Sequence, residues 1–280
     1  MSFLPDRALD RLRRLSDAPD RYRIEREVGR GGMGIVYEAW DAQLDRPVAL
    51  KVIDFGPPDE ARIAAQLEHP ALVPVYDSGT LADGRAYYAM RLVRGTRLDE
   101  FLPREHGLPA RLRVFQKVCD AVAFAHDRGV LHCDLKPQNI MVGGYGEVFV
   151  MDWGVARRAD HDEVPTFGTP PYRAPEGTLD RRGDIFALGR ILQDLTAGHD
   201  SRPLAAVAAR AMAPDPAQRY QTIAEFAAEI TRFADGLPVM AHPESTWEQA
   251  ARFIRRNQVL LLLVSAFLIV KIVLFFLRRS

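Results

Sequence analysis

The chain has 280 residues, of which 48% are hydrophobic and 26% are charged, with 19 Pro and 20 Gly. This is the composition of an ordinary folded protein, and it excludes a disordered, collagen-like or disulfide-scaffold chain. The overall formal charge is zero, but residues 1–250 hold 31 basic and 37 acidic residues, a net charge of −6. Nucleic-acid binding rests largely on neutralising phosphates, so we expect no nucleic-acid partner. Two cysteines, Cys119 and Cys133, are too few for a disulfide framework and favour a reducing compartment.

The two ends of the chain differ in character. Pro5 and Asp6 interrupt the N-terminus, where a signal peptide needs an unbroken apolar run, so we expect a cytosolic arm at 1–21. Residues 259–277 include 16 Val, Leu, Ile or Phe among 19 positions. As a helix this segment is roughly 28 Å long, close to the hydrocarbon thickness of a bilayer. We expect one membrane span there, after a linker at 236–258 and before a short tail at 278–280. A buried core helix or an interfacial helix fits less well, because the segment is apolar all round.

Between the ends, strand patterns come first and helical patterns follow. Strands are expected at 22–28, 35–40, 47–53, 72–78 and 87–93, with one helix at 58–67. Later helices are expected at 109–128, 184–196, 204–212 and 222–233, with short apolar runs at 129–131 and 148–151. The pattern predicts an α+β chain with a small β-rich lobe and a larger helical lobe. A ligand site is expected where the two lobes meet.

A glycine-rich segment follows the first expected strand. It reads Gly29-Arg30-Gly31-Gly32-Met33-Gly34 and enters the next strand. Glycines let the backbone approach a polyphosphate and offer it N–H groups. The pattern alone also fits a tight hairpin or a dinucleotide site. A dinucleotide site needs the loop to open a helix, whereas residues 35–40 have a strand pattern, which favours a hairpin over phosphates.

Lysine is rare in this chain, which has four among its 37 basic residues. Lys51 ends an apolar strand, where a charged group is costly unless it meets an anion. Glu60, on the next helix, is the expected partner that holds its ammonium toward ATP phosphates.

The segment from His132 to Asn139 carries the strongest chemical signal. Asp134 can accept a hydroxyl proton, Lys136 can neutralise a transferring phosphoryl group, and the Asn139 oxygen can bind Mg²⁺. Asp152 follows another short strand and offers a second metal-binding carboxylate. Hard oxygen ligands beside a triphosphate suit Mg²⁺, with Mn²⁺ as an alternative, rather than a transition metal of softer preference.

These motifs occur together and in order, and the chain resembles a eukaryotic-like serine/threonine protein kinase of the kind found in bacteria, over residues 22–235. The resemblance implies a bilobal protein-kinase-like fold, ATP and Mg²⁺ as cofactors, and protein substrates. It implies that Asp134 is the catalytic base, that Lys136 lies beside the γ-phosphate, and that Asn139 and Asp152 bind the metal. The nucleotide-binding residues that it implies are Val28, Gly29, Gly31, Gly34, Val36, Lys51, Glu60, Met90 and Val93. It also makes Asp184 a brace for the catalytic loop and Arg219 the partner of Glu176.

The chain departs from the family pattern at several positions. Cys133 stands where most relatives have an Arg that receives an activation-loop phosphate, and a thiol cannot do this. Phosphorylation of Thr166 is therefore not expected to switch the protein in the usual way. The nine-residue separation of Lys51 and Glu60 is short, which limits the movement of the helix or leaves the ion pair unformed. The connections at 176–184 and 196–204 are also short, which trims the surface where protein substrates dock.

Three functions follow from these observations. The first is an active, membrane-anchored, signalling serine/threonine kinase, a single-pass protein of the cell membrane with its kinase domain in the cytoplasm and with self-association for autophosphorylation. The second is a nucleotide-binding pseudokinase scaffold with little or no turnover, which the shortened docking regions motivate. A small-molecule kinase on a related fold is disfavoured by Thr169, the Ala174-Pro175-Glu176 run and Arg219.

Overall fold

The computed structural model describes residues 21–31, 34–53, 60–81, 84–105, 107–153, 157–158, 169–177, 180–243, 246, 249–250, 253–254 and 257–277. Nearly all of the expected N-terminal arm lies outside these residues, as do Thr166 and the side chain of Glu60.

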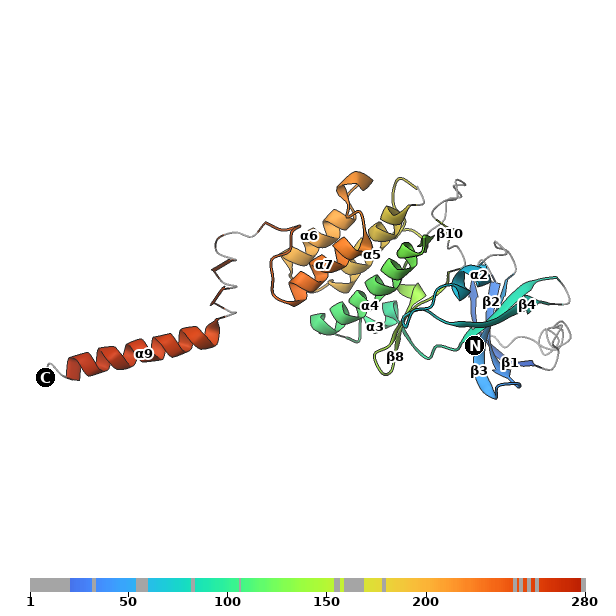
Figure 1. The fold of residues 1–280 in the computed structure, drawn as a ribbon, viewed down its shortest axis with the longest axis horizontal. Helices are drawn as coiled ribbons and strands as arrows, with labels where there is room; N and C mark the ends of the chain where they lie inside the picture. The colour runs from blue at the N-terminus through green and yellow to red at the C-terminus, as the bar shows by residue number, and fades with distance from the viewer. Residues whose placement is uncertain are drawn as a thin grey trace.

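The described residues between Tyr22 and Arg91 form a five-stranded antiparallel sheet in the order β1-β2-β3-β5-β4 (Figure 1). Its strands are β1 (Tyr22–Gly31), β2 (Gly34–Asp41), β3 (Arg46–Ile53), β4 (Val75–Thr80) and β5 (Ala86–Arg91), and α2 (Glu60–Ala65) lies between β3 and β4. Successive side chains of β3 point to opposite faces. Val48, Leu50 and Val52 pack in one apolar cluster, whereas Ala49 and Ile53 pack in another. The alternation puts Lys51 on the second face.

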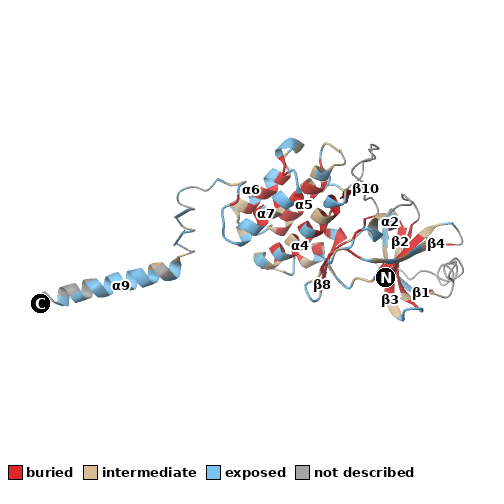
Figure 2. Cartoon of the chain, in the orientation of Figure 1, coloured by how far each residue is buried: buried red, intermediate tan, exposed pale blue. Residues whose placement is uncertain are grey.

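The part of the chain that follows this sheet is mainly helical and carries the largest apolar core, as the buried segments in Figure 2 show. Its helices are α3 (Leu98–Phe101), α4 (Leu108–Asp127), α5 (Arg181–Leu195), α6 (Arg202–Ala211) and α7 (Ile223–Ala234). Asp180, Ser201 and Thr222 begin α5, α6 and α7, because each side chain accepts a hydrogen bond from a free backbone N–H of the first turn.

Two small sheets lie where the helical part meets the five-stranded sheet. One has the order β6-β8-β9, with β6 (Gly95–Arg97), β8 (Ile140–Gly143) and β9 (Val148–Val150), and the other pairs β7 (Val130–Leu131) with β10 (Arg157–Arg158). Leu72 forms an isolated bridge with Val150, and Val150 N donates to Ala71 O at 2.9 Å. These bonds join the loop before β4 to the strand that leads to Asp152.

Most expected elements are confirmed, with shifted ends. The expected strand at 72–78 begins later, at Val75, because the chain first forms the bridge at Leu72. The expected helix at 58–67 is shorter, since α2 ends at Ala65. The short elements β6, β8 and α3 were not predicted.

The last helix, α9 (Gln258–Leu277), stands apart from the helical core in Figure 1. Its described apolar side chains are mostly exposed, for example Leu262 and Phe267. In the part of the chain that the structure describes, no helix reaches the length and apolar character required of a membrane-crossing segment. The helix at 259–277 is therefore confirmed as a helix, and the span expected there has no support from the structure.

Candidate active site

The carboxylate of Asp134 is the most heavily bonded group of the site. Its Oδ2 accepts from Lys136 Nζ at 2.6 Å and from Asn139 Nδ2 at 3.4 Å. Its Oδ1 accepts from Thr169 twice, from the backbone N at 3.0 Å and from Oγ1 at 2.8 Å. Lys136 Nζ also donates to Thr169 Oγ1 at 2.8 Å. The predicted base and its neighbours are thus fixed relative to one another, and Asp134, Lys136 and Asn139 come together as expected.

Asp184, on the buried side of α5, holds the backbone before Asp134. Its carboxylate accepts from His132 N at 2.8 Å, Cys133 N at 2.9 Å and His126 Nε2 at 2.8 Å. Burial by itself raises the pKa of this carboxyl, but the hydrogen bond from His126 and the nearby His132 outweigh it, so the pKa lies below its usual range. Cys133 has φ +65°, a left-handed conformation that a non-glycine residue adopts only where its surroundings enforce it. Asp184 supplies that constraint by accepting the hydrogen bond from Cys133 N, which fits its expected role as a brace for the catalytic loop.

Lys51, on β3, forms an ion pair with Asp152. Its Nζ donates to Asp152 Oδ1 at 2.7 Å. The Lys51 side chain is 6% exposed and that of Asp152 is 45% exposed, so the ammonium is buried while the carboxylate stays open. Burial raises the pKa of Asp152, but the Lys51 charge and hydrogen bond outweigh it and lower the pKa overall, with smaller contributions from His132 and Lys136. Lys136 also pairs with Asp134, so the two carboxylates share a neighbouring cation.

The metal-binding role predicted for Asn139 and Asp152 fits the free oxygens they present. Asn139 Nδ2 donates to Asp134 O at 2.8 Å, so its Oδ1 faces away and accepts no bond from the described residues. Met151 N donates to Asn139 O at 2.7 Å, which ties the segment before Asp152 to Asn139. Among the residues described, no three His, Cys, Asp or Glu side chains gather as a metal site. A Mg²⁺ ion held here would take its remaining oxygens from phosphate and water, as this ion usually does.

Three of the predicted nucleotide-binding residues, Val36, Met90 and Val93, lie in one apolar cluster. Ala49, next to Met90 in the sheet, and Phe149 belong to the same cluster. An apolar surface of this kind suits one face of a flat aromatic base. Val36 also pairs with Lys51 in register, so the apolar surface and the ammonium are adjacent.

The structure gives fewer contacts between the remaining predicted nucleotide-binding residues and the rest of the site. Val28, on β1, is 41% exposed and lies outside that cluster. Gly29 pairs with Val36 across the hairpin, and Gly31 pairs with Gly34. Glu60 begins α2, but its side chain falls outside the described residues, so its pairing with Lys51 stays a prediction.

The segment after Gly168 is tied to the helical part at three points. Besides Thr169, the Tyr172 hydroxyl donates to Asp194 Oδ2 at 2.8 Å, and burial together with this bond raises the pKa of Tyr172 to about 12. Arg219 donates two bonds of 2.7 Å to the two carboxylate oxygens of Glu176, as the sequence predicted for this pair.

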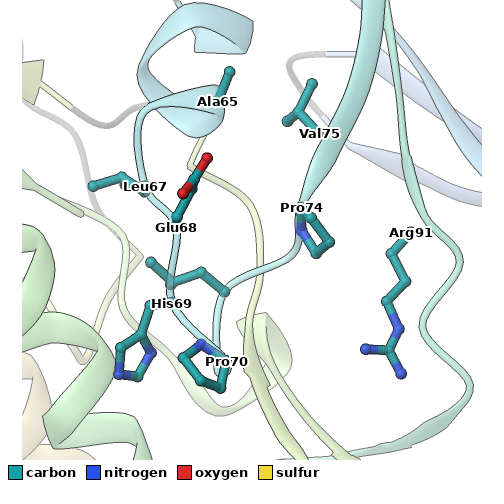
Figure 3. A pocket seen from close by; sticks show the side chains of 9 residues that line it. Ala65, Leu67, Glu68, His69, Pro70, Pro74, Val75 and Arg91 are labelled. Carbon is teal, nitrogen blue, oxygen red and sulfur yellow. The ribbon is translucent and has the colours of Figure 1, made fainter.

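A hollow of about 320 Å³ lies between the loop after α2 and the end of β5, and its lining includes none of the predicted site residues. The loop after α2, including Glu68 and His69, forms one wall, and Arg91 forms another (Figure 3).

Sequence reasoning missed several contributors. It gave Thr169 no contact with Asp134, and it overlooked His126, which supports Asp184, and Met151, which packs with the apolar cluster. The place of Met151 directly before Asp152 in the sequence could have identified it as a residue of the site. The others depend on long-range contacts that spacing does not reveal.

The chain has a small antiparallel sheet joined to a larger helical part, and the polar groups around Asp134 and Asp152 lie near their junction. This arrangement fits the bilobal protein-kinase fold. A family profile described as "Protein kinase domain" matches residues 22–235, and the chain belongs to the protein kinase family.

Its relatives include serine/threonine-protein kinases of bacteria. The chain is 36% identical to PknD of Protochlamydia amoebophila over 225 residues, which cover 63% of this chain and 23% of that protein. It is 33% identical to PknD of Chlamydia caviae in an alignment that covers 78% of this chain and 32% of the relative. It is 34% identical to PknB of Mycobacterium tuberculosis over 277 residues, covering 80% and 44%. The chain therefore spans less than half the length of these relatives.

Proposed function

We propose that this chain is a serine/threonine protein kinase that transfers the γ-phosphate of ATP to protein hydroxyls. The observation that carries the proposal is the convergence of Lys51, Asp134, Asn139 and Asp152. The names of its relatives support the serine/threonine class.

In this proposal each residue has a separate task. ATP supplies the phosphoryl group. Lys51 orients the phosphates, and the open carboxylate of Asp152 together with Asn139 Oδ1 would hold a Mg²⁺ ion, which when bound would neutralise phosphate charge. Asp134 orients the acceptor hydroxyl and takes its proton, and Lys136 stabilises the charge on the transferred group. Lys136 and Thr169 already hold Asp134 in place, so little reorganisation precedes transfer.

The test is phosphate transfer from labelled ATP by the full chain, with Mg²⁺ or Mn²⁺ present. The variant Asp134→Asn is expected to lose about 100-fold to 10,000-fold of the rate, the range for a general base. Asp120→Asn, an exposed change on α4, is the control and should keep full rate. Nucleotide-induced thermal stabilisation without transfer would favour the pseudokinase scaffold instead. Rates per molecule that rise with protein concentration would show autophosphorylation between copies.

Attachment of the kinase to the cytoplasmic face of the cell membrane, through 259–277, is a second part of the proposal. It is supported by the apolar sequence and by the exposed apolar side chains of α9. Cell fractionation with a salt wash tests it. The full chain should stay with membranes and a chain lacking 259–277 should not, and equal behaviour of the two would contradict the attachment. A signalling role follows only if this attachment and the transfer activity are both found.

A further inference from the structure

The segment Thr169–Gly177 forms one wall of the place where an acceptor hydroxyl must lie. Thr169 contacts Asp134 through both its backbone N and its Oγ1. The chain then turns, since Tyr172 N donates to Thr169 O at 2.8 Å. Arg173 directly follows this turn. Its Cα therefore lies no more than about 15 Å from that of Thr169, given about 3.8 Å per residue.

Three cations at this wall have carboxylate partners among the described residues. Lys136 pairs with Asp134, as described above. Arg190 lies 3.4 Å from Asp194, which also accepts from Tyr172. Arg219 forms its bidentate pair with Glu176.

The acids of α3 are also compensated. Arg97 donates two bonds to Asp99, of 3.1 and 2.8 Å, and lies 3.6 Å from Glu100. The acids that contribute to the electrostatics of Tyr172 are Asp194 and Asp99, and each is thus already matched by an arginine.

Arg173 differs from these cations. It is exposed, and it forms no hydrogen bond or ion pair with any residue in the described part of the chain. A peptide bound with its hydroxyl at Asp134 advances up to about 3.6 Å per residue when extended. The side chains one to three positions from its acceptor can therefore pass close to this guanidinium.

We propose that Arg173 selects substrates with Asp or Glu within three positions of the phosphorylated residue. The inference rests on the proposed kinase function and names the substrate class of the same site. A charge at the rim of a binding surface attracts an opposite charge before and during binding, and salt screens the attraction. The preference should therefore appear in KM rather than in kcat, because Arg173 makes the same contact before and during transfer.

The experiment compares three peptides with one Ser acceptor and with Glu, Ala or Lys at the neighbouring positions. The full chain is assayed alongside Arg173→Glu, Arg173→Lys and Arg113→Glu, the last being an equal charge change at an exposed position on α4. The unchanged chain and Arg113→Glu should prefer the Glu peptide over the Ala peptide by about fivefold in kcat/KM, the upper range for one exposed pair. Arg173→Lys should keep this order.

Arg173→Glu should reverse the order to favour the Lys peptide in kcat/KM. A Glu preference that survives in Arg173→Glu would overturn the inference, and so would equal use of all three peptides by the unchanged chain. A fall in the rate on all three peptides that Arg173→Lys shares would assign Arg173 to the fold and overturn it too. No transfer to any peptide by the unchanged chain would contradict the kinase function itself.

Discussion

The helical wall and the sheet wall of the site are built in different ways. On the helical wall, Asp134 and Asp184 each accept several hydrogen bonds, and the left-handed Cys133 is held between them. On the sheet wall, Gly29 and Gly31 have open space where a side chain would be, and Val28 is 41% exposed. The comparison indicates that the groups around Asp134 are fixed in advance, whereas the glycine-rich hairpin has the open space that the proposed nucleotide binding would need.

The largest expected effect on the helical wall comes from its buried ion pair. Arg219→Ala should lower the free energy of unfolding by about 3–5 kcal/mol, since it leaves Glu176 without its bidentate partner and empties a fully buried site. Denaturant unfolding measures this. Arg182→Ala is the matched control, because the Arg182–Asp180 pair is about one-third exposed and its loss should cost less than about 1 kcal/mol. Equal losses in the two variants would show that burial does not set the strength of this wall.

The next largest effect is expected at Asp184, which holds the backbone before Asp134. Asp184→Asn replaces one acceptor oxygen with an amide group that cannot accept from the His132 or Cys133 backbone. It should lower the free energy of unfolding by about 1.5–3 kcal/mol, the range for hydrogen bonds to a charged group. Transfer activity should fall as well, even where the variant is fully folded, because the Asp134 segment loses its support. A folded variant with unchanged kcat would contradict the bracing role.

Two glycine substitutions on the sheet wall should differ in their effect on the free energy of unfolding. A Cβ at Gly34 would lie 2.0 Å from the backbone oxygen of Val52, at φ +149°. Gly34→Ala should therefore lower the free energy of unfolding by about 1–3 kcal/mol. Gly31→Ala meets no atom within 4 Å and should change it by less than about 0.5 kcal/mol, so any effect should appear in the KM for ATP. Similar destabilisation by both variants would contradict an open hairpin.

The sequence was sufficient for what short motifs and periodicity encode. The strands around the glycine-rich hairpin, the helix at α4 and the grouping of Asp134, Lys136 and Asn139 follow from local patterns. It was not sufficient for contacts that join distant segments. The bonds of Thr169 to Asp134 cross 35 positions, and those of His126 to Asp184 cross 58. Short elements such as β6 escaped prediction because three residues carry too little periodicity to register.

The smallest expected effect is on the pH dependence of stability, and it compares Asp184 of the helical wall with Asp152, the partner of Lys51 on the sheet wall. The pKa of Asp184 is lowered in the folded chain, so its contribution is fully present above the ordinary Asp value of about 3.9 and is lost as the pH falls through the lower folded value. The stability difference between the unchanged chain and Asp184→Asn should be constant from pH 7 to about pH 5 and should shrink below about pH 4. Urea unfolding across this range measures it. Asp152 also has a lowered pKa, but its half-open carboxylate is partly screened by water, so Asp152→Asn should give a smaller change with the same sign. A difference for Asp184→Asn that stays constant to pH 3 would mean that the brace works by shape alone, with no contribution from its charge.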